Sequence, residues 1–506
     1  MNRKDIFILF AFVIIITAFS IFNTGYEPVH SDEITYLSIM KYHDDPSLYS
    51  KDFLISQILP GLPIPFYTIM GFMSGYINQD LLFLSVFVIT RVLLVLSVFF
   101  LAQTLFKNKN VSYWSVIAVL IIRGNIGMVP GSYDILDRIA SPFFLAAPIL
   151  LFSLTFFLKR RYTISSFLLA ASFYLHTTTS IFLLLLYGFY FLINFKKINK
   201  KVILSFIVFL ALAFPILFKS LMTKSPVLNF DQWIHFLTLR VSGHFFPTTW
   251  PFINTSLFFI LVAMFIVSLR YKPDKTKSNK VIVLSWGTLL LLLISFTFTE
   301  IYPIIPVIQA SLFRGVVLFR VIALIFVINF IIASFKYNYR KILASGMAMF
   351  LVSTAVVPIF TGEQKGLFSD VNISKEKGLW EDVSLKAKEL TQKDSLFITP
   401  PFSLGFTFFS ERSEFINWKT SGVGVYSGKF VAEAVKRFKV VCKHEFDFST
   451  RTELVEECKK GYERLNKEDF ELAKEEYGIT HIIVERPKQL NLSLIYENEG
   501  YRIYEL

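Results

Sequence analysis

Two adjacent carboxylates, Asp32 and Glu33, are the side chains of this sequence with the clearest potential for chemistry. They follow closely on an apolar segment, and Ser31 before them predicts a helix that begins at Asp32, because serine is a favoured helix N-cap. Carboxylates in the first turn of a helix face the positive end of its dipole and stay ionised. Such a carboxylate beside a membrane can take a proton from an acceptor hydroxyl or help to bind a metal ion. The alternative is structural: the pair only opens an amphipathic interfacial helix.

A second acidic group follows at Asp44-Asp45-Pro46, with Asp52 a few residues later. Aspartate next to proline is typical of turns, because the side chain can accept hydrogen bonds from nearby backbone amides. We therefore expect this group to form a turn and not a catalytic site.

Composition shows which elements must hold these carboxylates. Of the 506 residues, 54% are hydrophobic, only 18% are charged and 57 are phenylalanine, which excludes a water-soluble globule. The net charge of +13 lies in short clusters between apolar runs. It is therefore a signal of membrane topology, and no nucleic-acid partner is expected.

Apolar runs recur up to residue 358 and predict an all-α polytopic membrane domain, residues 1–358, with about eleven spanning helices. The predicted spans are 5–22, 81–105, 111–123, 139–158, 163–176, 179–195, 202–221, 253–270, 281–299, 315–335 and 342–358. Every second connection carries a basic cluster, and by the positive-inside rule these connections and the N-terminus face the cytoplasm. The remaining connections, predicted to face outward, are 23–61, 124–138, 222–252 and 300–314.

The segment 62–77 fits this topology poorly. It is apolar, but it is short and contains Pro63 and Pro65. A single crossing here would invert every later loop, so we interpret the segment as interfacial or re-entrant.

Residues 359–506 form a second domain, predicted to be extracytoplasmic. Strand-like patterns at 395–399, 414–417 and 481–484 and helical patterns at 429–439 and 467–476 predict a small α/β domain. Trp418 is expected in its core, with glycan binding as the alternative. Cys442 and Cys458 are the only cysteines, and whether they form a disulfide stays open from spacing alone.

This layout resembles the GT-C superfamily of membrane glycosyltransferases. The resemblance is carried by the first span, the acidic pair at the start of a juxtamembrane helix, and the patch from Asp45 to Asp52, which is similar to a DPxLYxxD pattern in prokaryotic relatives. It implies a polyprenyl-phosphate-linked sugar as donor. In the protein mannosyltransferase and aminoarabinose transferase branches an acidic residue of the first outer loop is the base, and here the match falls on Asp32, with Glu33 beside it.

Transfer from such a donor leaves charge on the departing phosphate, so cations are needed near the outer boundary of the bilayer. Arg138 precedes a span and is a candidate phosphate ligand; the alternatives are pairing with Asp134 or snorkelling. His176 lies at the outer hairpin between two short spans, where an ionisable residue suggests function. Its alternative is a neutral imidazole bonded to the threonines that follow it.

Three further candidates follow in the next outer loops. Arg240 and His244 are four residues apart, on one face if the segment is helical, and could hold a phosphate together. Arg314 is the preferred ligand in the last outer loop, unless it only pairs with Glu300. Arg320 would lie deeper and therefore needs a partner or an aqueous cavity.

No metal-binding motif is present, and no cofactor is predicted with certainty. A divalent cation at Asp32 and Glu33 stays an open alternative, since some GT-C branches use one. The sequence contains no Walker A motif and no dinucleotide fingerprint, which argues against ATP coupling and a soluble nucleotide sugar.

The leading hypothesis is a membrane glycosyltransferase that moves a sugar from a polyprenyl-phosphate donor to a glycan, lipid or protein acceptor at the outer face. A polysaccharide polymerase or ligase is the second enzyme hypothesis, and it would depend less on Asp32. The non-enzymatic alternative is a lipid or glycan transporter, for which inverted repeats and broken mid-membrane helices would be expected.

Overall fold

The computed structural model describes residues 2–27, 32–61, 65–122, 134–222, 227, 229–271, 275–335, 338–360 and 378–506. The chain divides into two compact units. The first, here the helical unit, contains Met1–Pro28, Phe83–Leu217 and Gly243–Ile373, and the second, here the mixed unit, contains Val29–Leu82, Phe218–Ser242 and Ser374–Leu506. The predicted division at residue 358 follows chain order, whereas these units are assembled from separated segments.

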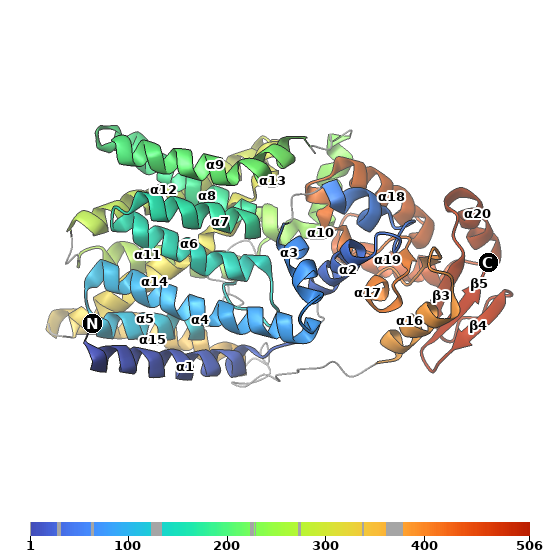
Figure 1. The fold of residues 1–506 in the computed structure, drawn as a ribbon, viewed down its shortest axis with the longest axis horizontal. Coiled ribbons are helices and arrows are strands. Elements are labelled where there is room, and N and C mark those ends of the chain that lie inside the picture. Colours follow the sequence, from blue (N-terminus) through green and yellow to red (C-terminus); the bar gives the residue numbers. More distant parts are fainter. Residues whose placement is uncertain are drawn as a thin grey trace. The chain divides into compact units, whose positions relative to one another are not determined.

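Each predicted span coincides with a helix. The α-helices that lie wholly or mainly in the helical unit are α1 (Arg3–Thr24), α4 (Gln79–Phe106), α5 (Lys109–Ile121), α6 (Pro142–Leu158), α7 (Tyr162–Leu175), α8 (Thr177–Ile193), α9 (Lys200–Met222), α11 (Phe252–Ser268), α12 (Lys275–Phe296), α13 (Ile305–Ala310), α14 (Val316–Ser334) and α15 (Asn338–Phe360). Short helical turns join them: η4 (Phe195–Lys197), η5 (Pro247–Thr249), η6 (Thr297–Ile301) and η7 (Leu312–Gly315). Figure 1 shows α6, α7 and α8 side by side.

By length and composition, five apolar stretches of this unit can cross a membrane: Arg3–Thr24, Gln79–Phe106, Lys200–Ser220, Lys277–Ile301 and Ile305–Ser334. Shorter apolar helices, among them α5 to α8 and α11, accompany them. The chain is therefore a multi-pass membrane protein, and the number of its crossings stays a prediction.

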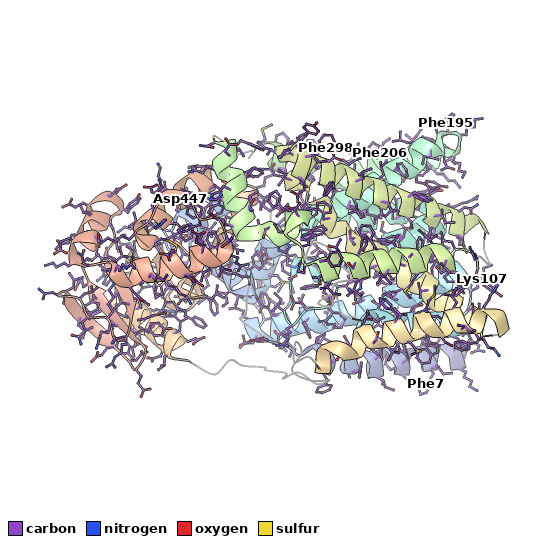
Figure 2. All side chains as sticks on the ribbon, turned by 180° about the vertical axis from the view of Figure 1, so that it is seen from behind. Phe7, Lys107, Phe195, Phe206, Phe298 and Asp447 are labelled. Carbon is purple, nitrogen blue, oxygen red and sulfur yellow. A yellow bond between two sulfur atoms is a disulfide. The ribbon has the colours of Figure 1, made fainter. Side chains whose placement is uncertain are left out.

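Burial distinguishes the central helix of this unit from its periphery. α14 is apolar and buried nearly all round, and it packs against α5, α11 and α15. On α1 and α9, by contrast, large apolar side chains such as Phe7 and Phe206 are exposed at the edge of the bundle (Figure 2). An exposed apolar stripe on a long helix is the surface that lipid chains cover.

Arg320 lies in the buried part of α14 and has the partner that its depth requires. Its Nη1 donates to Asp134 Oδ1 at 2.8 Å, and its Nη2 donates to the carbonyl of Ile122. Both charged side chains are almost fully buried, 2% and 8% exposed. The expectation of a partner for Arg320 is thus confirmed, and α14 is tied to the connection that precedes α6.

The basic connections are joined to one another at one end of the unit. Lys109 pairs with Asp5 at 2.7 Å, which links α5 to α1. Lys277 Nζ donates to the carbonyl of Thr104 at 3.1 Å, and Lys280 Nζ donates to that of Phe157 at 3.2 Å. These contacts place the ends of α4, α6 and α12 together, as the alternation of basic clusters predicts.

The mixed unit contains a five-stranded sheet with the order β2-β1-β3-β5-β4. Its strands are β1 (Leu396–Ile398), β2 (Ser413–Glu414), β3 (His481–Glu485), β4 (Ser493–Glu497) and β5 (Tyr501–Glu505). β1 pairs in parallel with β2 and β3, and β5 pairs antiparallel with β3 and β4. The predicted strands at 395–399, 414–417 and 481–484 are present, the second in shortened form, so the expected small α/β fold is confirmed.

The helices of this unit come from both halves of the chain. They are α2 (Asp32–Asp44), η1 (Phe53–Ile58), η2 (Leu59–Gly61), α3 (Pro65–Ser74), most of α10 (Phe230–Phe245), α16 (Leu379–Leu390), α17 (Phe406–Ser410), η8 (Thr420–Val425), α18 (Gly428–Cys442), α19 (Arg451–Arg464) and α20 (Lys467–Tyr477). The predicted helices at 429–439 and 467–476 correspond to α18 and α20. Figure 1 shows α16 beside the β5–β4 edge of the sheet.

A disulfide joins α18 to α19, which settles the question that cysteine spacing left open. It links Cys442 with Cys458. A Cβ on Gly461 would lie 1.7 Å from the carbonyl oxygen of Cys442, so only glycine fits there. The two helices are thus held together both covalently and by close backbone contact.

The described part of the segment 62–77 contains only α3, a helix of 10 residues. Ten helical residues span about 15 Å, about half of the hydrocarbon core. Phe66, Tyr67 and Met70 are buried, whereas Phe72 and Tyr76 are exposed. One buried and one exposed apolar face is the character of an interfacial helix, and residues 62–64 lie outside the described residues.

We expect Arg320→Met to destabilise the protein by about 3–5 kcal/mol, because Asp134 would keep its charge in a buried position without this partner. The double variant Arg320→Met/Asp134→Leu should recover most of that loss, since no buried charge remains. Chemical unfolding of the purified protein in detergent measures both. Equal stability of the single and the double variant would contradict the assigned pair.

Candidate active site

The acidic pair lies at the first turn of α2, where the sequence predicts it. Asp32 is the first residue of the helix, and its side chain lies outside the described residues. Glu33 is only 1% exposed. Burying a carboxyl group costs free energy. Glu33 therefore differs from a solvent-exposed acid that only begins an amphipathic helix.

α2 is held on the part of the mixed unit that contains α17. Ser38 Oγ lies 2.9 Å from Thr407 Oγ1, and Lys41 Nζ donates to Glu411 at 2.8 Å. On another face the ring of Tyr36 stacks on that of Tyr67 of α3, with centroids 3.9 Å apart. Contacts along the helix thus fix its orientation and, with it, the backbone position of Asp32 and Glu33.

The patch from Asp45 to Asp52 forms the predicted turn. This turn packs on the C-terminal part of the mixed unit. Tyr49 is fully buried, and its hydroxyl donates to the carbonyl of Thr407 at 2.9 Å. Asp45 pairs with Lys393. These contacts dock the first loop on the C-terminal part of the mixed unit.

Asp52 and Glu414 form a buried pair of carboxyl groups that the sequence analysis did not identify as a site. Asp52 accepts from the backbone amides of Ile55 at 2.9 Å and of Glu414 at 3.1 Å. Glu414 Oε1 accepts from Thr399 Oγ1 at 2.6 Å and from Asn417 Nδ2 at 3.2 Å. The strand β2, which contains Glu414, brings this side chain to its position.

Burial sets the protonation of this pair. It raises the pKa of Glu414 to about 8, and the negative charge of Asp52 adds to the effect. It also raises the pKa of Asp52, to about 6, against the backbone amides that favour the ionised form. Both groups line a small cavity together with Thr35 and Ser38 of α2. Burial therefore favours the protonated form of both carboxyl groups, and more strongly that of Glu414.

In the helical unit the structure brings two of the predicted cations together. Nη1 of Arg314, in η7, lies 3.5 Å from Nε2 of His176, the residue that joins α7 to α8. The other ring nitrogen of His176 is the N-cap acceptor of α8: Nδ1 lies 2.6 Å from Thr179 Oγ1 and accepts from the Thr179 amide at 3.4 Å. The threonine contacts expected if His176 has only a structural role are therefore present. In addition, His176 has the charged side chain of Arg314 as a neighbour.

Phe245 connects His244 to this pair. The guanidinium of Arg314 lies over the ring of Phe245 at 5.8 Å, and the ring of His244 is edge-on to that of Phe245 at 6.3 Å. Glu300, the predicted alternative partner of Arg314, accepts instead from the amide and the hydroxyl of Thr248, both at 2.8 Å. The Phe245 ring thus contacts both Arg314 and His244, and this contact between separate connections is not visible in the sequence.

Arg138 and Arg240 have other surroundings. Arg138 lies 3.8 Å from Glu27, because Asp134 is engaged by Arg320. Arg240 Nε donates to the carbonyl of Trp418 at 2.7 Å, and its Nη2 donates to that of Lys419. These carbonyls give Arg240 a role in holding the fold, and Trp418 is buried as expected for a core residue.

The predicted pairing of Arg240 with His244 assumed an unbroken helix. α10 is kinked between them, since Val241 has the non-helical angles φ −136° and ψ 24°. Residues four apart share a face only where the helix is regular. The structure therefore removes the geometric basis of this pairing.

Among the described residues, no group of three or more His, Cys, Asp or Glu side chains could hold a metal ion. The alternative of a divalent cation at Asp32 and Glu33 stays untested, because the Asp32 side chain lies outside the described residues.

Residues 379–426, which run from α16 through η8, match the model of a domain of unknown function, DUF6798. No curated protein matches the sequence. Two solved structures are similar at 10% identity: ArnT from Cupriavidus metallidurans, with a TM-score of 0.45 over 99% of this chain and 98% of that one, and the arabinofuranosyltransferase AftD from Mycobacteria, with a TM-score of 0.47 over 100% of this chain and 42% of that one. Both are GT-C glycosyltransferases, and the chemistry of this chain rests on its own residues.

The pKa of Glu414, about 8 in the folded protein, lies above its ordinary value of 4.5. The unfolded chain thus releases a proton that the folded protein keeps, and the contribution of this group to stability falls as pH rises from about 4.5 to about 8. We expect Glu414→Gln to remove this part of the pH dependence, a few kcal/mol in all.

Thermal and chemical unfolding of the full-length protein between pH 5 and 9 measures this effect. Glu499→Gln, at an exposed carboxylate, is the matched control and should keep the wild-type slope. An unchanged slope in Glu414→Gln would show that Glu414 does not hold a proton in the folded state.

Proposed function

We propose that the protein is a membrane glycosyltransferase that moves a sugar from a polyprenyl-phosphate-linked donor to an acceptor hydroxyl on the outer face of the membrane. The observation that supports this most is the contact of Arg314 with His176 at an end of the helical unit. α7 begins with Tyr162 beside Lys280 of the basic end and ends at His176. The pair therefore lies at the end away from the basic connections, where a lipid-linked donor would present its phosphate to outward-facing residues.

The tautomer of His176 makes this pair suitable for an anion. If Nδ1 accepts from the Thr179 amide, as an N-cap must, the ring proton of the neutral imidazole is on Nε2. Nε2–H and the Arg314 guanidinium are then two donors 3.5 Å apart, and two donors do not satisfy each other. A phosphate oxygen between them would accept from both, with charge-assisted bonds to Arg314.

The chemistry that these residues would support is a displacement at the anomeric carbon of the sugar. The acceptor oxygen forms the new glycosidic bond, the bond from carbon to phosphate oxygen breaks, and its electron pair stays on the phosphate. In this proposal Asp32 of the mixed unit is the base that takes the proton of the acceptor hydroxyl. Separately, His176 and Arg314 of the helical unit are proposed to bind the phosphate of the donor.

Two features support the assignment of this chemistry to the outer side. The basic connections meet at one end of the helical unit, and the positive-inside rule assigns that end to the cytoplasm. The disulfide in the mixed unit favours an oxidising compartment for residues 378–506. A donor dissolved in the membrane reaches this side, whereas soluble nucleotide sugars do not.

We expect Asp32→Asn to lower transfer by about 10²-fold or more, because the amide cannot take the acceptor proton. Asp44→Asn, at the exposed end of the same helix, is the control and should retain activity. Membranes of cells that express each variant are supplied with polyprenyl-phosphate-linked sugar, and incorporation into envelope glycan, lipid and protein is measured. Full activity of Asp32→Asn at equal protein level would contradict a base at this position and favour a polymerase or ligase.

Arg314→Gln is expected to weaken binding of a polyprenyl phosphate by about 10- to 100-fold, because charge-assisted hydrogen bonds contribute about 1.5–3 kcal/mol each. His176→Asn should weaken it less, since one neutral donor is lost. Binding of undecaprenyl phosphate to the purified protein measures this effect, with Arg3→Gln at the basic end as control. Wild-type affinity in Arg314→Gln would exclude Arg314 as a phosphate ligand.

A further inference from the structure

The basic end of the helical unit contains a cluster of cations that the proposed transfer does not use. Lys280 of α12 is at its centre and is only 4% exposed. Its electrostatic neighbours are three further cations, Arg160, Lys197 and Lys277. These residues come from three different connections, so the tertiary fold and not the local sequence assembles them.

Lys280 is placed by the last turn of α6 and by aromatic rings. Its Nζ donates to the carbonyls of Phe157 at 3.2 Å and Leu158 at 3.5 Å, at the C-terminal end of that helix. It also lies 5.5 Å from the ring of Tyr162 and 5.9 Å from that of Tyr190. Carbonyls and rings orient the ammonium group, but they carry no formal negative charge to balance it.

Lys197 approaches the same tyrosine from η4. Its Nζ lies 5.5 Å from the centre of the Tyr190 ring and 3.5 Å from the Tyr190 hydroxyl, and it donates to Asn194 Oδ1 at 2.6 Å. Arg160, in the turn between α6 and α7, interacts electrostatically with both Tyr162 and Tyr190. Three positive side chains thus surround two tyrosines.

Carboxylates are scarce at this end. Among the described residues of the basic connections, Asp5 is the acid, and it is engaged by Lys109 at 2.7 Å. Asp274 lies in the connection before Lys275 and outside the described residues. Among the described residues, Arg160, Lys197 and Lys280 are held close together and repel one another, so an anion from outside the chain would relieve this repulsion.

An apolar surface adjoins the cluster. Leu192, Ile193, Phe195 and Ile198 are exposed on either side of Lys196 and Lys197, and Figure 2 shows Phe195 at an edge of the helical unit. Phosphate-binding cations next to an apolar surface match a molecule that has an anionic head and hydrocarbon chains. An inorganic phosphate ion has no hydrocarbon chain that could contact these exposed apolar side chains.

We propose that Arg160, Lys197 and Lys280 bind the phosphate headgroup of an anionic phospholipid in the cytoplasmic leaflet, with its acyl chains against the exposed residues of α8 and η4. Basic pockets between spanning helices on the cytoplasmic side are suited to such headgroups. Tyrosines at the level of the headgroups add an amphipathic wall. This site lies at the opposite ends of α7 and α8 from His176, and it does not depend on the proposed transfer.

The test measures lipid binding to the purified full-length protein by native mass spectrometry, with phosphatidylglycerol and phosphatidylcholine as probes. We expect the wild type to prefer phosphatidylglycerol. Because each cation near an anionic surface contributes about fivefold in affinity, the triple variant Arg160→Gln/Lys197→Gln/Lys280→Gln should lose about 100-fold for phosphatidylglycerol and little for phosphatidylcholine.

A matched control has the same charge change at the same end of the unit, at Arg3, Lys4 and Lys107, each replaced by Gln; Figure 2 shows Lys107 away from Phe195. It should keep the preference. Lys197→Gln alone, at an exposed side chain, should lose about fivefold and keeps the test valid if the triple variant does not fold. Equal loss in the control, equal binding of both lipids, or competition by millimolar inorganic phosphate as effective as that by the lipid would each overturn the proposal.

Discussion

A charged side chain in the apolar interior of a helical bundle must be neutralised, and this constraint organises the end of the helical unit that carries the candidate cations. Arg320 of α14 engages Asp134 and the carbonyl of Ile122. Arg91 of α4 donates to the carbonyl of Asp137 and to Thr24 of α1. The stretch 134–138 is thereby tied to α14 and α4, and Arg138 lies beside Glu27.

The same rule has a different outcome in the mixed unit, where buried polar groups are satisfied mainly by the backbone. Arg240 and Arg412 donate to carbonyls, and both oxygens of Asp52 accept from amides. The pKa of Glu414 is instead raised, because burial and the nearby Asp52 both favour its protonated form. These contacts join the first loop to residues 379–426, so the acidic helix α2 is part of a folded body and not a free connection.

The two ends of the helical unit differ in how their cations are compensated. At one end Arg314 faces a histidine and an aromatic ring, and at the other Lys280 faces carbonyls and tyrosines. The donor phosphate is proposed to bind at the first end and a phospholipid headgroup at the second, so the two proposals concern opposite ends of α7 and α8.

The sequence by itself determined the apolar helices, the start of α2 at Asp32, the strands near 396 and 481, and the need of Arg320 for a partner. These follow from local patterns: apolar runs of membrane length, a cap before two carboxylates, alternating residues, and the cost of a charge in lipid. Only the tertiary structure decided that His176 meets Arg314, that Asp52 meets Glu414, that Val241 separates Arg240 from His244, and that the cysteines are bonded. Each of these depends on contacts between residues far apart in the chain or on a local break in a helix, and neither leaves a periodic signal in the sequence.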